Sequence, residues 1–253
     1  MQLNYRKFGD KGPAVIILHG LLGSLDNWQS IAKMLSEKYR VFIIDQRNHG
    51  RSPHEEEMSY GVLANDVLEF CQQQHISNAS FIGHSMGGKV VMLLALNHPE
   101  LVDKLIVVDI APVCYEGGHE SILFAMAEAP IHATTDRKVI DVFLEKRIPE
   151  FGERQFVLKN LNRSEHGQLT WKCNLEALIK NYRNLMLFPA NSRVFDKSAY
   201  FIKGNASDYI NKTNWKECLH FFPKAVLISV PNAGHWVHAD NPQGFLSSLL
   251  AIL

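Results

Sequence analysis

The chain has 253 residues and carries 26 Lys and Arg against 26 Asp and Glu, a formal net charge of zero. Such a balance creates no long-range field toward nucleic acid or an anionic membrane, so the expected partner is a small molecule. The length suits one α/β domain, or a core domain that carries one insertion. The first ten residues lack an apolar signal region, and no later apolar run reaches membrane-spanning length. We therefore expect a soluble, cytoplasmic protein without membrane insertion.

Four cysteines are scattered along the chain without a C-x-x-C pair: Cys71, Cys114, Cys173 and Cys218. This spacing argues against both a zinc site and a disulfide framework. We expect four buried free thiols.

The first half of the chain alternates short apolar runs with helical patterns. The run Ala14–Leu18 predicts a buried strand, and apolar residues from Trp28 to Leu35 then recur at helical spacing. Further strands are predicted at Arg40–Ile44, Ser80–Ile82 and Leu105–Val108, with an amphipathic helix from Leu63 to Cys71 and a helix from Met86 to Leu96. This order indicates a mostly parallel sheet that helices cover on both faces.

The alternation stops between Val113 and Asp196, where the pattern is mainly helical, and it resumes with strands at Ala199–Lys203 and Ala225–Val230. We therefore predict a core in two parts, residues 1–112 and 197–253, around a helical insertion at residues 113–196. An insertion between core strands lies over their carboxyl ends, where open α/β sheets bind ligands. It is interpreted as a lid, and a plain structural insert is the alternative.

The segment Gly83 to Gly87 has the pattern G-x-S-x-G, which places a serine on a sharp turn between a strand and a helix. Side chains in place of the two glycines would clash with neighbouring backbone. A β-favouring run precedes Ser85 and a helical pattern follows it, as this turn requires. We predict that Ser85 is a nucleophile.

A serine hydroxyl needs an adjacent base, and histidine titrates in the right range. Among twelve histidines, His235 follows a predicted strand late in the chain, which agrees with the order serine, acid, histidine of α/β hydrolases. His238 is expected to have a hydrogen-bonded structural role. No H-E-x-x-H pattern or matching cysteine and carboxylate set accompanies the two histidines, so no metal site is expected.

Two aspartates compete for the acid that would orient this histidine. Asp109 ends the apolar run Leu105–Val108, and Asp208 follows the next core strand. Each also has a structural alternative, Asp109 as a capping residue and Asp208 as an ordinary loop aspartate.

An oxyanion needs two preorganised backbone N–H donors. Met86 directly follows the predicted nucleophile and is expected to supply one of them. The segment His19 to Ser24 follows the first buried strand, where a His-Gly oxyanion loop belongs, and Leu21 is expected to supply the other.

With these residues in place, the chain resembles the α/β-hydrolase superfamily over nearly its whole length, and within it the small bacterial esterases of the YbfF type and their mitochondrial abhydrolase relatives. The motifs are His19-Gly20-Leu21, Asp45 to Pro53, Gly83 to Lys89 and Gly234 to His238. The resemblance implies a serine carboxylesterase or thioesterase that acts without a cofactor on short- to medium-chain acyl esters or acyl-CoA. It also implies Asp109 as the acid, because the position that carries the acid in most of the superfamily is Ser207 here.

Two cations lie inside these motifs. Arg47 is expected to bond a loop carbonyl, and Lys89 to lie on a solvated helix face, although either could meet an anionic group of a substrate. Two other functions remain open: carbon–carbon bond hydrolysis on the same scaffold, and ligand binding without catalysis.

Overall fold

The computed structural model describes residues 1–253. Its strands are β1 (Tyr5–Phe8), β2 (Ala14–Leu18), β3 (Arg40–Ile44), β4 (Ala79–His84), β5 (Val102–Val108), β6 (Leu161–Arg163), β7 (Leu169–Trp171), β8 (Ala199–Gly204) and β9 (Ala225–Val230). Its α-helices are α1 (Gln29–Leu35), α2 (Tyr60–Gln73), α3 (Met86–Asn97), α4 (Glu120–Glu128), α5 (Arg137–Glu145), α6 (Phe151–Leu158), α7 (Leu175–Met186), α8 (Lys212–Phe221), α9 (Val237–Asp240) and α10 (Pro242–Ile252), and a 3₁₀ helix, η1 (Leu25–Trp28), precedes α1.

Seven strands form one twisted sheet in the order β1-β3-β2-β4-β5-β8-β9. Strand β1 is antiparallel to β3, and all other neighbours pair in parallel. The predicted α/β-hydrolase architecture is confirmed, and β1 is a strand of this sheet that was not predicted from the sequence. Because parallel strands end at the same edge of a sheet, the loops after β2, β4, β5, β8 and β9 gather at one edge.

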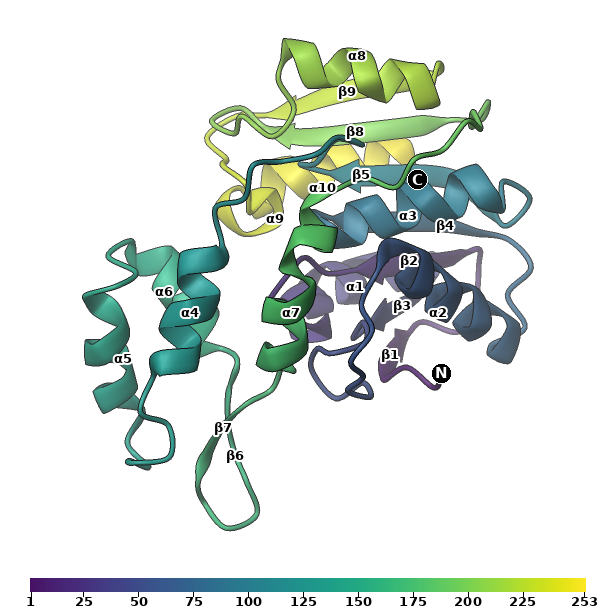
Figure 1. Cartoon of the computed structure of the whole chain (residues 1–253). Coiled ribbons are helices and arrows are strands. Elements are labelled where there is room, and N and C mark those ends of the chain that lie inside the picture. The colour runs from purple at the N-terminus through teal and green to yellow at the C-terminus, as the bar shows by residue number, and fades with distance from the viewer.

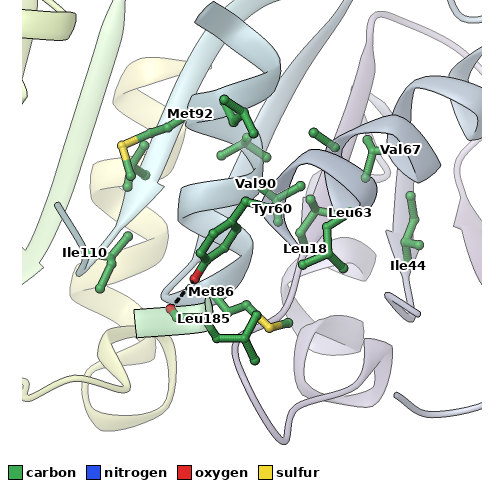
Figure 2. Close-up of a cluster of buried hydrophobic side chains, with 14 of the residues drawn as sticks. Leu18, Ile44, Tyr60, Leu63, Val67, Met86, Val90, Met92, Ile110 and Leu185 are labelled. Carbon is green, nitrogen blue, oxygen red and sulfur yellow. Dashed lines mark hydrogen bonds between the residues drawn. The ribbon is translucent and has the colours of Figure 1, made fainter. Parts of the chain in front are cut away.

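Alternate residues of each buried strand pack into two separate hydrophobic cores, one on each face of the sheet. In β2, Ile16 and Leu18 pack with α2 and α3, whereas Val15 and Ile17 pack with α1 and α10 on the other face. Figure 1 shows this layering, with α2 and α3 in front of the sheet and α10 behind it. Figure 2 shows the α2–α3 side, where Leu18 lies close to side chains of both helices. Each large side chain buried in this way contributes roughly 1.5–3 kcal/mol to folding.

Between β5 and β8 the chain leaves the sheet and forms a separate group of elements, α4 to α7 with the β6–β7 hairpin (Figure 1). Most of this segment is helical, as the sequence pattern predicted, and the β6–β7 hairpin is an addition to that pattern. The Tyr60 hydroxyl at the start of α2 donates to the Leu185 carbonyl at 2.7 Å, which joins the end of α7 to the core (Figure 2). The boundaries of a lid at residues 113 and 196 stay a prediction.

The cysteines correct one expectation. Cys71, Cys173 and Cys218 are buried free thiols, but Cys114 is exposed, because the loop after β5 runs along the surface before α4 begins. No helix in the chain combines the length and the apolar character that crossing a membrane would need.

Candidate active site

The predicted nucleophile occupies the turn between β4 and α3. Ser85 has a left-handed φ of +51°, a strained conformation for a residue with a side chain. A Cβ on Gly83 would lie 2.2 Å from the Gly87 carbonyl oxygen, and a Cβ on Gly87 would lie 2.6 Å from the His19 oxygen. Both glycines are therefore required by close backbone contacts. The turn places the partly buried Ser85 at the edge of the sheet where the parallel strands end, in the lining of a cavity.

The predicted acid and base lie in contact. The Nδ1 of His235, in the loop between β9 and α9, is 2.8 Å from Oδ2 of Asp109. Asp109 directly follows β5, its φ is +52°, and its side chain is completely buried. Its second oxygen, Oδ1, accepts a hydrogen bond of 3.1 Å from the Gly204 N–H at the end of β8. The competing Asp208 is exposed in the next loop, and its side chain makes none of these contacts.

One contact of the Asp109 carboxylate was not predicted from the sequence. The Ser207 hydroxyl donates to the same Oδ2 that accepts from His235, at 2.5 Å. Ser207 is the position at which the resemblance to the superfamily would place the acid, and its hydroxyl is instead a hydrogen-bond donor to Asp109. The unusual serine at that position was the available signal.

Two aromatic rings pack against the His235 imidazole. Tyr209 stacks on it with ring centroids 4.1 Å apart and an interplanar angle of 22°. The His84 ring lies 4.8 Å away, and its Nε2 donates to the His235 carbonyl at 2.9 Å. Because His84 precedes Ser85, this bond ties the histidine loop to the serine turn. No local sequence pattern marked Tyr209.

His238 corrects an expectation. Its buried Nδ1 has no hydrogen-bond partner, and its ring instead stacks on Trp28 with centroids 4.4 Å apart. Burial lowers the pKa of His238 to about 4, so the ring is neutral at pH 7. It serves as a packing residue because α9 presses it against the helix that follows β2.

The loop after β2 has the geometry of a backbone donor site. The Gly20 carbonyl accepts from His19 Nδ1 at 2.8 Å and from the Gly23 N–H at 3.0 Å. In a trans peptide the N–H points away from the carbonyl, so the Leu21 N–H is directed to the opposite side. A Cβ on Gly20 would lie 3.1 Å from the Ser85 Cβ, which shows how closely this loop approaches the serine. Burial lowers the pKa of His19 to about 4, which keeps the ring neutral.

These groups surround one cavity of about 440 Å³, whose lining is mainly apolar. Ser85, His235, Leu21 and Met86 all line it. The segment between β5 and β8 contributes its other wall, including Tyr115, His119, Ile122, Phe156, Leu185 and Met186. Such a cavity is of the size that binds small molecules.

The two cations noted in the motifs are both held internally. Lys89 is not on a solvated face: it is 1% exposed, because the end of α7 covers this side of α3. Its ammonium donates to the carbonyls of Met186 and Leu187 at 2.9 and 2.8 Å, and burial lowers its pKa to about 7. Arg47 bonds the Glu57 carbonyl, as expected, and also pairs with the buried Asp66.

The chain is similar to known proteins over most or all of its length. Residues 13–127 match the family described as alpha/beta hydrolase fold. The sn-1-specific diacylglycerol lipase ABHD11 of Danio rerio is 37% identical over 263 residues, which cover 100% of this chain and 83% of the relative. The chain belongs to the α/β-hydrolase family. Esterase YbfF of Escherichia coli is 34% identical over 239 residues, 93% of this chain and 91% of that protein.

A solved structure, a marine microorganism esterase, superimposes on this α/β hydrolase with a TM-score of 0.97 at 41% identity. The match covers 100% of this chain and 99% of the other. The relatives named as esterases and lipases span nearly the whole chain, so this α/β hydrolase is an enzyme of the esterase/lipase type.

Proposed function

We propose that this α/β hydrolase is a serine esterase with Ser85 as nucleophile, His235 as base and Asp109 as acid. Its substrates are short- to medium-chain acyl esters or acyl-CoA thioesters, which it hydrolyses through an acyl-Ser85 intermediate. The observation that carries the proposal is the 2.8 Å contact between Asp109 and His235 beside the cavity that Ser85 lines.

In the first step His235 removes the proton of Ser85. Because Nδ1–H donates to Asp109, the lone pair of Nε2 is free to accept that proton. The Ser85 oxygen attacks the carbonyl carbon, and the carbonyl electron pair moves onto oxygen. The N–H groups of Leu21 and Met86 stabilise this oxyanion. His235 then returns the proton to the leaving alcohol or thiol, which departs and leaves acyl-Ser85.

Water completes the cycle by the same route. His235 takes a proton from the water as its oxygen attacks the acyl carbon, and the two N–H donors again hold the oxyanion. The intermediate collapses to a carboxylic acid, and Ser85 recovers its proton from His235. One ester and one water thus become one acid and one alcohol.

The cavity supports an acyl substrate. Residues 113–196 provide much of its apolar wall, so we propose that they act as a lid that encloses the acyl chain. The relatives named as an esterase and as a diacylglycerol lipase favour oxygen esters. We also propose thioester substrates, because the same acyl transfer to Ser85 can release a thiol in place of an alcohol.

The test compares the wild-type enzyme with Ser85→Ala on p-nitrophenyl esters and CoA thioesters from acetyl to palmitoyl. The wild type should hydrolyse the shorter chains best, and the variant should lose at least about four decades of kcat. Hydrolysis near the wild-type rate in Ser85→Ala would refute the nucleophile. Turnover of the oxygen esters alone would limit the substrate class to esters.

A further inference from the structure

The loop that would supply the Leu21 donor has contacts beyond its own turn. Its next residue, Leu22, is buried and has a left-handed φ of +59°, a conformation that a leucine rarely adopts unless its surroundings impose it. Both polar groups of its backbone are held by side chains from elsewhere in the chain. The Leu22 N–H donates to His49 Nε2 at 3.2 Å, and its carbonyl accepts from Asn160 Nδ2 at 2.7 Å.

Neither partner is free to move. His49 is completely buried, and its Nδ1 donates to the Arg47 carbonyl at 3.0 Å, which leaves Nε2 as the acceptor. Burial, followed by the nearby His19, lowers the pKa of His49 to about 3, so the ring stays a neutral acceptor. Asn160 is 4% exposed. Its backbone N–H donates to the Val157 carbonyl at 2.9 Å, and its backbone carbonyl accepts from the Lys172 N–H at 2.8 Å.

Asn160 lies between α6 and β6, in the segment between β5 and β8. This segment therefore bonds directly to the loop after β2, on the residue that follows Leu21. With its N–H directed to His49, Leu22 cannot turn that group toward the cavity, whereas the N–H of the adjacent Leu21 has no partner within the chain.

We infer that His49 and Asn160 are positioning residues for the oxyanion hole, and that the lid segment takes part in forming the hole through Asn160. The inference rests on the proposed function, because it presumes that Leu21 stabilises an oxyanion. Neither side chain touches the substrate. They act by fixing Leu22 in its left-handed conformation, which keeps the adjacent Leu21 N–H aligned.

The test uses Asn160→Ala with Asn181→Ala as its matched control. Asn181 also joins the lid segment to the core, through a 2.8 Å bond from its amide to the Glu56 carbonyl, but it does not touch the loop after β2. Removing an oxyanion donor outright lowers kcat by about 10²–10³, so misalignment in Asn160→Ala should lower it by about tenfold. KM should change little, and Asn181→Ala should keep the wild-type kcat.

A second readout separates alignment of the donor from general damage to the site. Each variant is assayed on a p-nitrophenyl ester and on the matching thionoester, whose sulfur accepts hydrogen bonds weakly and so depends less on the oxyanion donors. Asn160→Ala should lower the ratio of the ester rate to the thionoester rate, and Asn181→Ala should leave this ratio unchanged. His49→Phe should behave like Asn160→Ala, and His49→Gln, whose amide oxygen can accept from Leu22, should recover part of the loss.

The inference is overturned by a wild-type kcat in Asn160→Ala, by an equal loss in Asn181→Ala, or by a fall in kcat at a constant ester to thionoester ratio. Circular dichroism and thermal melting establish whether each variant folds. If His49→Phe does not fold, the comparison of Asn160→Ala with Asn181→Ala still tests the inference. Activity surviving in Ser85→Ala would instead refute the proposed function. The two failures are therefore distinguishable.

Discussion

Replacement of Asp109 by Asn is the most informative single change, because it keeps the volume of a buried side chain and removes its charge. The carboxylate accepts from three donors: Gly204 through Oδ1, and Ser207 and His235 through Oδ2. An amide has one acceptor oxygen, so its NH₂ group must face one of these donors. If it faces His235, the imidazole must accept at Nδ1, and Nε2 then carries the proton and cannot act as a base.

The structure sets the size of the effect. With Nδ1 and Oδ2 2.8 Å apart, the centres of charge of an imidazolium and a carboxylate lie about 4 Å apart, where they attract by about 4 kcal/mol at an effective dielectric constant of 20. That energy corresponds to about three decades of rate, and the unfavourable tautomer adds to it. We expect Asp109→Asn to lower kcat by about 10³–10⁴.

The assay is steady-state hydrolysis of a p-nitrophenyl ester, with thermal melting to establish folding. Asp208→Asn is the matched control, because Asp208 is exposed in the neighbouring loop, and it should retain wild-type kcat within about twofold. A loss of less than tenfold in Asp109→Asn, or a larger loss in Asp208→Asn, would refute the assignment of the acid.

Three further predictions follow from buried polar contacts. Ser207→Ala removes a hydrogen bond to a charged carboxylate, which is worth about 1.5–3 kcal/mol, so kcat should fall about tenfold or more in the same assay. An unchanged kcat would show that this bond does not orient the acid. Burial lowers the pKa values of His19 and His49 to about 4 and about 3, so between pH 6.5 and pH 4 the unfolded chain binds protons that the native state does not. The free energy of unfolding should therefore fall as the pH falls through this range, by at most about 1.4 kcal/mol per pH unit for each histidine. Urea titrations at several pH values should show that this free energy depends less steeply on pH in His49→Gln than in the wild type. An equal dependence on pH in the two proteins would contradict this. Asp66→Asn leaves the buried guanidinium of Arg47 without its charged partner and should lower the free energy of unfolding in urea by about 3–5 kcal/mol, whereas a loss below 1 kcal/mol would indicate that Arg47 finds another partner.

The parts of the fold that local pattern determines were predictable from the sequence. The runs Ala14–Leu18, Arg40–Ile44 and Ala225–Val230 are strands with the same bounds in the structure, because each is a mainly apolar, β-favouring run flanked by polar or turn residues. The strand, turn and helix around Ser85 follow from the close packing that Gly83 and Gly87 allow.

The parts that depend on distant contacts were not predictable. Lys89 lies in a helical pattern, but that pattern does not indicate that the end of α7, nearly a hundred residues later in the chain, covers its side chain. The stacking of Tyr209 on His235 and the bond from Ser207 to Asp109 join loops after different strands, and no spacing in the chain encodes them. The hairpin Leu161–Trp171 consists of two three-residue strands, too short for an alternating pattern to predict.

The central claim is that Ser85 is the nucleophile, and covalent labelling tests it most directly. The enzyme is treated with one equivalent of a fluorophosphonate, and the product is examined by intact-mass and peptide mass spectrometry. The account predicts one phosphonyl group per chain, attached to Ser85, with parallel loss of esterase activity and no labelling of Ser85→Ala. Labelling of another residue with full loss of activity, or an unlabelled wild-type enzyme that hydrolyses esters, would contradict it.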